Sequence, residues 1–171
     1  KYFESADLPK AELAHLLRSK AVLMPGVTVT LTYEKSGDQQ SWLYKGGLRD
    51  YLMQTLNADP VIPLFEGAHY ADGGETENFA EGEGAAWCVA FTEDGAPMRE
   101  SYVNLIPTVA GGTHESGLKD GLFQAVKGFI DMHSLLPKGV KLMPEDVFSR
   151  ASFVLSAKVL DPQFQGQIKE R

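Results

Sequence analysis

The sequence predicts an α+β fold in which helices cover one face of a four-stranded sheet. Two patterns support this prediction. Apolar side chains alternate with threonines over residues 27–33, which is typical of a half-buried strand, and apolar side chains recur at helical spacing after Thr113. The expected order is helix, strands, helix, strands, long helix and strand. The connection across the long helix can therefore join two parallel strands.

The N-terminal part of the chain is expected to form a helix, a hairpin and a second helix. Leucines at helical spacing predict the first helix over residues 11–23. The alternating strand 27–33 precedes a turn sequence at residues 36–38, which predicts a hairpin whose returning strand contains residues 42–44. Apolar positions on one side of residues 48–56 predict the second helix.

The C-terminal part is expected to supply the four-stranded sheet and its long helix. The strands are predicted at residues 60–65, 85–91, 99–106 and 151–160. Residues 67–84 hold many glycines and acidic side chains and are interpreted as a mobile hairpin loop. Thr113 is a suitable N-cap for the long helix, and Pro144 starts a short helix. The apolar stripe of the long helix is expected to be buried: Leu118, Leu122, Ala125, Val126, Phe129 and Ile130.

Length and composition narrow the class of protein. A chain of 171 residues with 43% hydrophobic side chains can form one domain, expected to span residues 1–171. The formal net charge of −7 argues against a surface that grips nucleic acid throughout. The single cysteine, Cys88, lies in an apolar run and is expected in the core of a cytoplasmic protein. No apolar run is long enough to span a membrane, and the start at Lys1 leads us to expect part of a longer polypeptide.

Five segments of the chain, taken together, resemble the ATPase subunit of bacterial type IIA DNA topoisomerases. They are residues 20–27, 102–108, 111–114, 136–142 and 161–171. The Gly-Gly-Thr-His and Asp-Pro-Gln-Phe motifs are specific in this order and spacing, whereas either one alone would be weak. The resemblance covers essentially the whole chain. The Leu-Ile-Pro-Thr and Leu-Pro-Lys-Gly-Val-Lys sequences favour the B subunit of topoisomerase IV over that of gyrase.

The resemblance implies a fold, partners and a cofactor. The chain would be the second, or transducer, domain of such a protein. Its fold would resemble domain 2 of ribosomal protein S5, with a left-handed β-α-β crossover that departs from the usual right-handed rule. An upstream ATPase domain of the GHKL class would bind ATP and Mg²⁺ and form a self-dimer, and a Toprim domain would follow downstream. DNA and the A subunit of topoisomerase IV would be the partners in the intact enzyme, which couples ATP hydrolysis to strand passage, decatenation and relaxation. The chain alone would be inactive and would bind no cofactor.

The resemblance assigns the functional site to the last residues of the chain. Lys169 would be the catalytic residue and contact the γ-phosphate of ATP, where an ammonium group neutralises charge that develops during phosphoryl transfer. Gln167 would donate a hydrogen bond to the same phosphate from the same side of an extended loop. The family usually has threonine between these two positions, and Ile168 stands there in this chain. The branched shape is kept, whereas a hydroxyl is lost.

Residues near the start of the long helix allow other interpretations. The turn at residues 111–113 could cradle a phosphate at a helix N-terminus, but as a nucleotide signal it is weak, and a structural turn and cap is the preferred interpretation. His114 and Glu115 could serve a metal site or a free-standing hydrolase, but the HExxH pattern fails because position 118 is leucine. The remaining histidines lie far apart in the sequence: His15, His69 and His133. No metal site is predicted.

Charged side chains suggest one alternative function. Seven acidic residues are interpreted as a solvated surface rather than as paired catalytic carboxylates: Asp59, Glu66, Asp72, Glu75, Glu77, Glu81 and Glu83. Seven basic residues are interpreted first as scattered surface side chains, although they could form a local stripe along DNA: Lys10, Arg18, Lys20, Lys119, Lys127, Lys138 and Lys141. The alternative is an S5-like nucleic-acid-binding or interaction module without a role in ATP hydrolysis. Such a module would bind duplex DNA with a steep salt dependence.

Overall fold

The computed structural model describes residues 8–74 and 79–165 of the chain. The chain divides into two compact units, Lys1–Gln54 and Thr55–Arg171. That both units belong to one functional domain stays a prediction. Within the described ranges, no helix combines the length and the apolar character that crossing a membrane requires.

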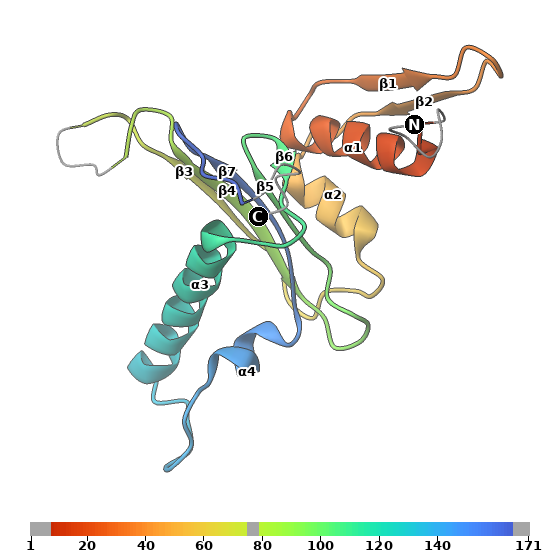
Figure 1. The fold of residues 1–171 in the computed structure, drawn as a ribbon. Helices are drawn as coiled ribbons and strands as arrows, with labels where there is room; N and C mark the ends of the chain where they lie inside the picture. Colours follow the sequence, from red (N-terminus) through yellow and green to blue (C-terminus); the bar gives the residue numbers. More distant parts are fainter. Residues whose placement is uncertain (1–7, 75–78, 166–171) are drawn as a thin grey trace. The chain divides into compact units, whose positions relative to one another are not determined.

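The first unit consists of a helix, a hairpin and a second helix (Figure 1). Helix α1 spans Lys10–Leu23, and α2 spans Leu48–Thr55. Between them, β1 (Val29–Thr32) pairs antiparallel with β2 (Gln39–Trp42). Burial alternates along β1 as the sequence predicts, and the order of elements in this unit is confirmed.

Arg18 and two tyrosines organise the packing of the first unit. Arg18 Nε donates to the Tyr44 hydroxyl at 2.6 Å, and its guanidinium carbon lies 5.1 Å from the centroid of the Tyr51 ring. The two tyrosine rings meet edge to face with centroids 5.8 Å apart. Arg18, considered above for a basic stripe along DNA, is therefore engaged in packing within its own unit.

The second unit is built on a five-stranded sheet with the order β3-β4-β7-β5-β6. Its strands are β3 (Phe65–Tyr70), β4 (Gly84–Phe91), β5 (Arg99–Val103), β6 (Ile106–Pro107) and β7 (Ala151–Lys158). β7 runs antiparallel to β4 and parallel to β5, so the last strand of the unit lies between two earlier ones. The first seven residues of β7 are all buried, which means that both faces of this strand are covered.

Helices α3 (Thr113–Met132) and α4 (Pro144–Phe148) lie on the same face of this sheet (Figure 1). The core beneath them comprises Val89, Val147, Phe148, Ala151, Phe153 and Leu155. Leu118, Leu122 and Val126 of α3 pack against this core. Burying one such apolar side chain stabilises a fold by about 1.5–3 kcal/mol, so the contact holds α3 on the sheet.

The connection through α3 joins parallel strands, as the sequence predicts. β5 and β7 pair in parallel, with Arg99 opposite Phe153. The α+β class and the helices on one face are confirmed as well. The sheet has one strand more than predicted, because a turn at Asn104 and Leu105 divides the expected strand 99–106 into β5 and the short β6. Both turn residues have positive φ, as a two-residue type I′ hairpin requires. The left-handed sense of the crossover stays a prediction.

The first strand of the sheet lies later in the chain than predicted. β3 spans Phe65–Tyr70 instead of residues 60–65, so the beginning of the expected loop 67–84 belongs to the sheet. β3 is an edge strand whose residues are mostly exposed, and its pairing with β4 defines it. An edge strand without an apolar alternation leaves no periodic signal in the sequence. Residues 75–78 of the same loop lie outside the described part of the chain.

The apolar stripe of α3 is less buried than the sequence predicts. No residue of α3 is fully buried, Ala125 is exposed, and Phe129 is 59% exposed. The reason is geometric, because the contacts with the core stop at Val126 while the helix continues to Met132. The helix also begins one residue earlier than expected, with Gly112 rather than Thr113 in the N-cap position.

Gly84 allows β3 and β4 to approach closely. A Cβ atom at this position would lie 2.0 Å from the carbonyl oxygen of His69. Because that oxygen belongs to the paired backbone, we expect Gly84→Ala to lower the free energy of unfolding by about 1–3 kcal/mol, measured by urea denaturation. Gly128→Ala is the control, since a Cβ there meets open space on α3. Gly128→Ala should raise the free energy of unfolding by about 0.5–1 kcal/mol. Similar losses in both variants would contradict the close approach of β3 and β4 at Gly84.

Candidate functional site

The residues that the resemblance assigns to the site, Gln167, Ile168 and Lys169, lie outside the part of the chain that the structure describes. The structure does describe residues 159–165, which follow β7 and precede these site residues in the chain. A hollow of about 480 Å³ lies between this segment and the first residues of α3. We therefore describe the site through the residues that contact the segment 159–165.

Two side chains hold the first residues after β7. The Asn104 amide donates from Nδ2 to the carbonyl oxygen of Val159 at 2.8 Å, and its Oδ1 accepts from the Val159 N–H at 2.9 Å. Glu83 Oε1 accepts from the Leu160 N–H at 2.6 Å, and Oε2 accepts from the Ala80 N–H at 2.8 Å. The backbone hydrogen bonds, first that from Leu160, hold the pKa of Glu83 below its ordinary value.

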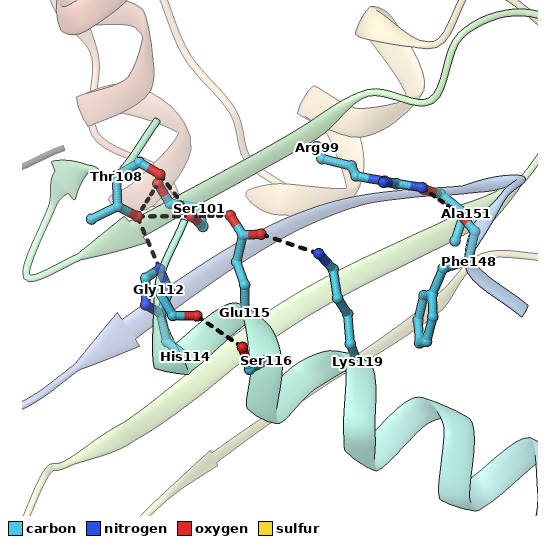
Figure 2. Close-up of polar contacts among 10 residues, drawn as sticks. All are labelled: Arg99, Ser101, Thr108, Gly112, His114, Glu115, Ser116, Lys119, Phe148 and Ala151. Atoms are coloured by element: carbon cyan, nitrogen blue, oxygen red, sulfur yellow. Dashed lines mark hydrogen bonds and ion pairs between the residues drawn. The ribbon is translucent and has the colours of Figure 1, made fainter. Parts of the chain in front are cut away.

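A polar cluster joins the start of α3 to β5 (Figure 2). Ser101 Oγ lies 2.7 Å from Thr108 Oγ1 and 2.7 Å from Glu115 Oε1. His114 Nε2 lies 2.9 Å from Thr108 Oγ1. Ser101 and Thr108 are only 4% and 1% exposed, so protein groups rather than bulk water satisfy their hydroxyls. The cluster therefore fixes where α3 begins relative to the sheet.

The carboxylate at one end sets the direction of these hydrogen bonds. Glu115 can only accept, so Ser101 donates to Glu115, Thr108 donates to Ser101, and the remaining lone pair of Thr108 receives the Nε2 proton of His114. Glu115 Oε2 also pairs with Lys119 Nζ at 3.6 Å. Burial lowers the pKa of His114, and the charge of Glu115 opposes that shift. A neutral His114 with its proton on Nε2 completes the chain.

The cluster offers little to hydrolytic chemistry. The hydroxyls of Ser101 and Thr108 are buried and bonded, so neither is an accessible nucleophile. His114 is hydrogen-bonded to Thr108, and Glu115 is hydrogen-bonded to Ser101. The interpretation of these two residues as a hydrolase site is therefore without support. Within residues 8–74 and 79–165, no three histidine, cysteine, aspartate or glutamate side chains are grouped so that they could hold a metal ion.

The glycine turn before α3 is best explained as a structural turn. Gly111 has a φ of 71°, a conformation that other residues rarely adopt. A Cβ atom on Gly111 would lie 3.2 Å from Glu115 Oε2, so a carboxylate already lies beside this turn at the helix N-terminus. Negative charge at that position complements the helix dipole and would repel a phosphate.

The charged residues considered in the sequence lie in several different environments. Lys127 pairs with Asp131 at 2.6 Å on α3, whereas Lys138 and Lys141 are exposed in the loop before α4. Glu66 lies in β3 and is exposed. Since the basic residues are distributed over both compact units, a continuous basic stripe stays a prediction.

Sequence reasoning missed the supporting roles of Asn104 and Glu83. In the sequence, Asn104 is part of a family-like segment and Glu83 is one of several acidic residues interpreted as solvated. Their partners Val159 and Leu160 lie 55 and 77 residues away in the chain. The one local signal is an asparagine at a hairpin turn, which tolerates positive φ.

The fold, the Gly-Gly-Thr-His turn at the start of α3 and the segment after β7 together define a class of protein. The chain belongs to the DNA gyrase B family, whose model matches residues 47–171. Among individual proteins, it is 42% identical to the B subunit of DNA topoisomerase 4 from Pseudomonas aeruginosa over 172 residues, which cover 100% of this chain and 26% of that protein. It is also 42% identical to the corresponding Escherichia coli protein over 174 residues, with 99% and 26% covered. These findings confirm the resemblance, and the chain spans about a quarter of the length of these relatives.

Solved structures share the fold. One is the topoisomerase IV ATP-binding domain of Francisella tularensis in complex with a small-molecule inhibitor, with a TM-score of 0.74, 34% identity, and 99% of this chain and 43% of that chain covered. Another is the 43K ATPase domain of Thermus thermophilus gyrase B in complex with an aminocoumarin, with a TM-score of 0.75, 22% identity, and 96% and 43% covered. The second supports the fold alone.

His114 gives the stability of the fold a pH dependence. Its pKa in the folded chain lies below 6.5, so the unfolded chain binds the proton more readily. The contribution of neutral His114 to the free energy of unfolding is complete above the pKa of His114 in the unfolded chain. It is lost as the pH falls through the pKa of His114 in the folded chain. We expect the free energy of unfolding to decrease from about pH 7 to about pH 5, and His114→Gln, whose amide can still donate to Thr108, to flatten this decrease.

Chemical denaturation at a series of pH values measures this effect. His133→Gln is the matched control, because His133 is exposed just after α3 and lies outside the polar cluster. A flattening as large in His133→Gln as in His114→Gln would contradict the role assigned to His114.

Proposed function

We propose that the chain is the transducer domain of the ATP-hydrolysing subunit of a type IIA DNA topoisomerase of the topoisomerase IV type. The observation that carries this proposal is the 42% identity to the B subunit of DNA topoisomerase 4 over the full length of the chain. The match continues beyond the sheet and includes the segment that holds Gln167 and Lys169.

Lys169 and Gln167 supply the chemistry of the proposed function. The Lys169 ammonium contacts the γ-phosphate of ATP, where negative charge moves during hydrolysis, and Gln167 donates a hydrogen bond to the same phosphate. An interaction that strengthens in the transition state raises the rate constant more than it raises ground-state affinity. ATP and Mg²⁺ bind an upstream domain of the intact protein, and the chain alone neither binds ATP tightly nor hydrolyses it.

The fold supports a mechanical role for the rest of the chain. The segment that carries Lys169 continues directly from β7, the central strand, whose residues are buried in the core. A close-packed core moves as a body rather than deforming locally. Contact of Lys169 with the phosphate would therefore change the orientation of the second unit. Together with the A subunit of topoisomerase IV and a second copy of the ATPase domain, this change would couple ATP hydrolysis to DNA strand passage, decatenation and relaxation.

Lys169→Ala tests this proposal in the intact protein that contains the chain. Loss of an ammonium that stabilises the transition state is expected to lower kcat for ATP hydrolysis by roughly 10²-fold, with a smaller effect on KM for ATP. The measurement is steady-state ATP hydrolysis at saturating nucleotide.

Lys35→Ala is the matched control, since it removes an exposed lysine from the turn between β1 and β2 that is not among the residues considered for binding DNA. Its rate should equal that of the unchanged protein. A normal rate in Lys169→Ala would overturn the proposed role. If duplex DNA bound the chain alone with a steep salt dependence while Lys169→Ala left hydrolysis unchanged, the nucleic-acid module would be the better account.

A further inference from the structure

The two strands that flank β7 both turn away near the point where β7 ends. β4 begins at Gly84 and β5 ends at Val103, while β7 continues to Lys158. The residues just outside these strands are Glu83 and Asn104. Asn104 has a φ of 49°, which directs the backbone into the turn toward β6. Backbone pairing to β7 therefore stops at the start of the segment that leads to the C-terminus.

Side chains continue this pairing on both edges of β7. A primary amide presents one N–H and one C=O as a peptide group does, and Asn104 satisfies both backbone groups of Val159 with it, at 2.8 and 2.9 Å. On the other edge, Glu83 accepts from the N–H of Leu160 at 2.6 Å. Successive N–H groups of a strand point to opposite edges, which is why Val159 bonds toward β5 and Leu160 toward β4.

We propose that Asn104 and Glu83 are positioning residues for Lys169. By continuing the hydrogen bonding beyond the end of β7 they hold Val159 and Leu160, the root of the following segment, at the bend where that segment leaves the sheet. The proposal rests on the function proposed above for Lys169. Lys169 follows Leu160 by nine residues, so the position of Val159 and Leu160 fixes the point from which the segment that carries Lys169 starts.

The choice of residue types agrees with this role. Asparagine is one of the few residues other than glycine that enters the left-handed region at low cost, so position 104 combines the turn and the amide. The Glu83 carboxylate uses one oxygen for Leu160 and the other for Ala80, which ties the loop before β4 to the same root. Hydrogen bonds to a charged acceptor are stronger than those between neutral groups.

The first experiment measures the root directly, in the intact protein. Asn104→Gly keeps the positive φ without strain and removes the amide, and Glu83→Ala removes both acceptor oxygens. We expect amide hydrogen exchange at Val159 and Leu160 to accelerate by roughly 2- to 10-fold, as the loss of one net hydrogen bond implies. Leu105→Gly and Glu81→Ala are matched controls, because Leu105→Gly changes the other positive-φ residue of the same turn and Glu81→Ala removes a carboxylate two residues before Glu83.

The second experiment connects the root to ATP hydrolysis. Both variants are expected to lower kcat several-fold with a smaller change in KM for ATP, while the two controls hydrolyse ATP at the normal rate. In a protein that already carries Lys169→Ala, the same variants should cause no further loss. A general loss of structure would act equally in both backgrounds, since independent effects add.

The outcomes separate this inference from the function on which it rests. Normal hydrolysis by Lys169→Ala would overturn the proposed function itself. If Lys169→Ala is slow but Asn104→Gly and Glu83→Ala hydrolyse ATP normally despite faster exchange at Val159 and Leu160, the function stands and the positioning role is wrong. Equal fold-losses with and without the Lys169 side chain would likewise overturn the positioning role. Unchanged exchange at both amides would refute the extended pairing.

Discussion

Strand β7 receives backbone hydrogen bonds from β4 on one edge and from β5 on the other, and its residues from Ala151 to Ala157 are all buried. The second unit depends on this double pairing. Without it, β4 and β5 would have no common neighbour, and the core under α3 and α4 would lose Phe153 and Leu155. Arg99 strengthens the junction, because its guanidinium donates to the carbonyl oxygens of Phe148 and Ala151 (Figure 2).

The same strand joins the core to the proposed site. At its end, backbone pairing is replaced by hydrogen bonds with the side chains of Asn104, which donates and accepts, and Glu83, which accepts. The buried cluster around Ser101 and Thr108 fixes the start of α3 on the neighbouring strand. The hydrogen bonds that fix the end of β7 and the start of α3 therefore lie next to the segment that leads to Lys169. The exposed far end of α3 lies outside this set of contacts.

The sequence was most informative where periodicity reflects burial. The alternation in β1 and the helical spacing in α3 predicted both elements close to their observed bounds, and the order of elements anticipated the parallel pair β5 and β7. Edge strand β3 was predicted too early in the chain, because its exposed residues carry no apolar alternation. The contacts of Asn104 and Glu83 could not be predicted from the sequence, because they join residues far apart in the chain and no local pattern encodes them. Resemblance to a family assigns roles to Gln167 and Lys169, whereas no local pattern in the residues marks them.

The chain order of the sheet also bears on how the unit folds during synthesis. β7 is the last strand of the sheet to leave the ribosome, yet its neighbours pair with it across long separations. Arg99 of β5 and Phe153 of β7, for example, are paired and lie 54 residues apart in the chain (153 − 99). Until β7 emerges, β4 and β5 each keep an open edge and the apolar face under α3 stays incomplete. Such non-local pairing is slow and leaves aggregation-prone surface exposed. A nascent chain that pauses before Ala151 would therefore be a substrate for chaperones that bind unpaired strands.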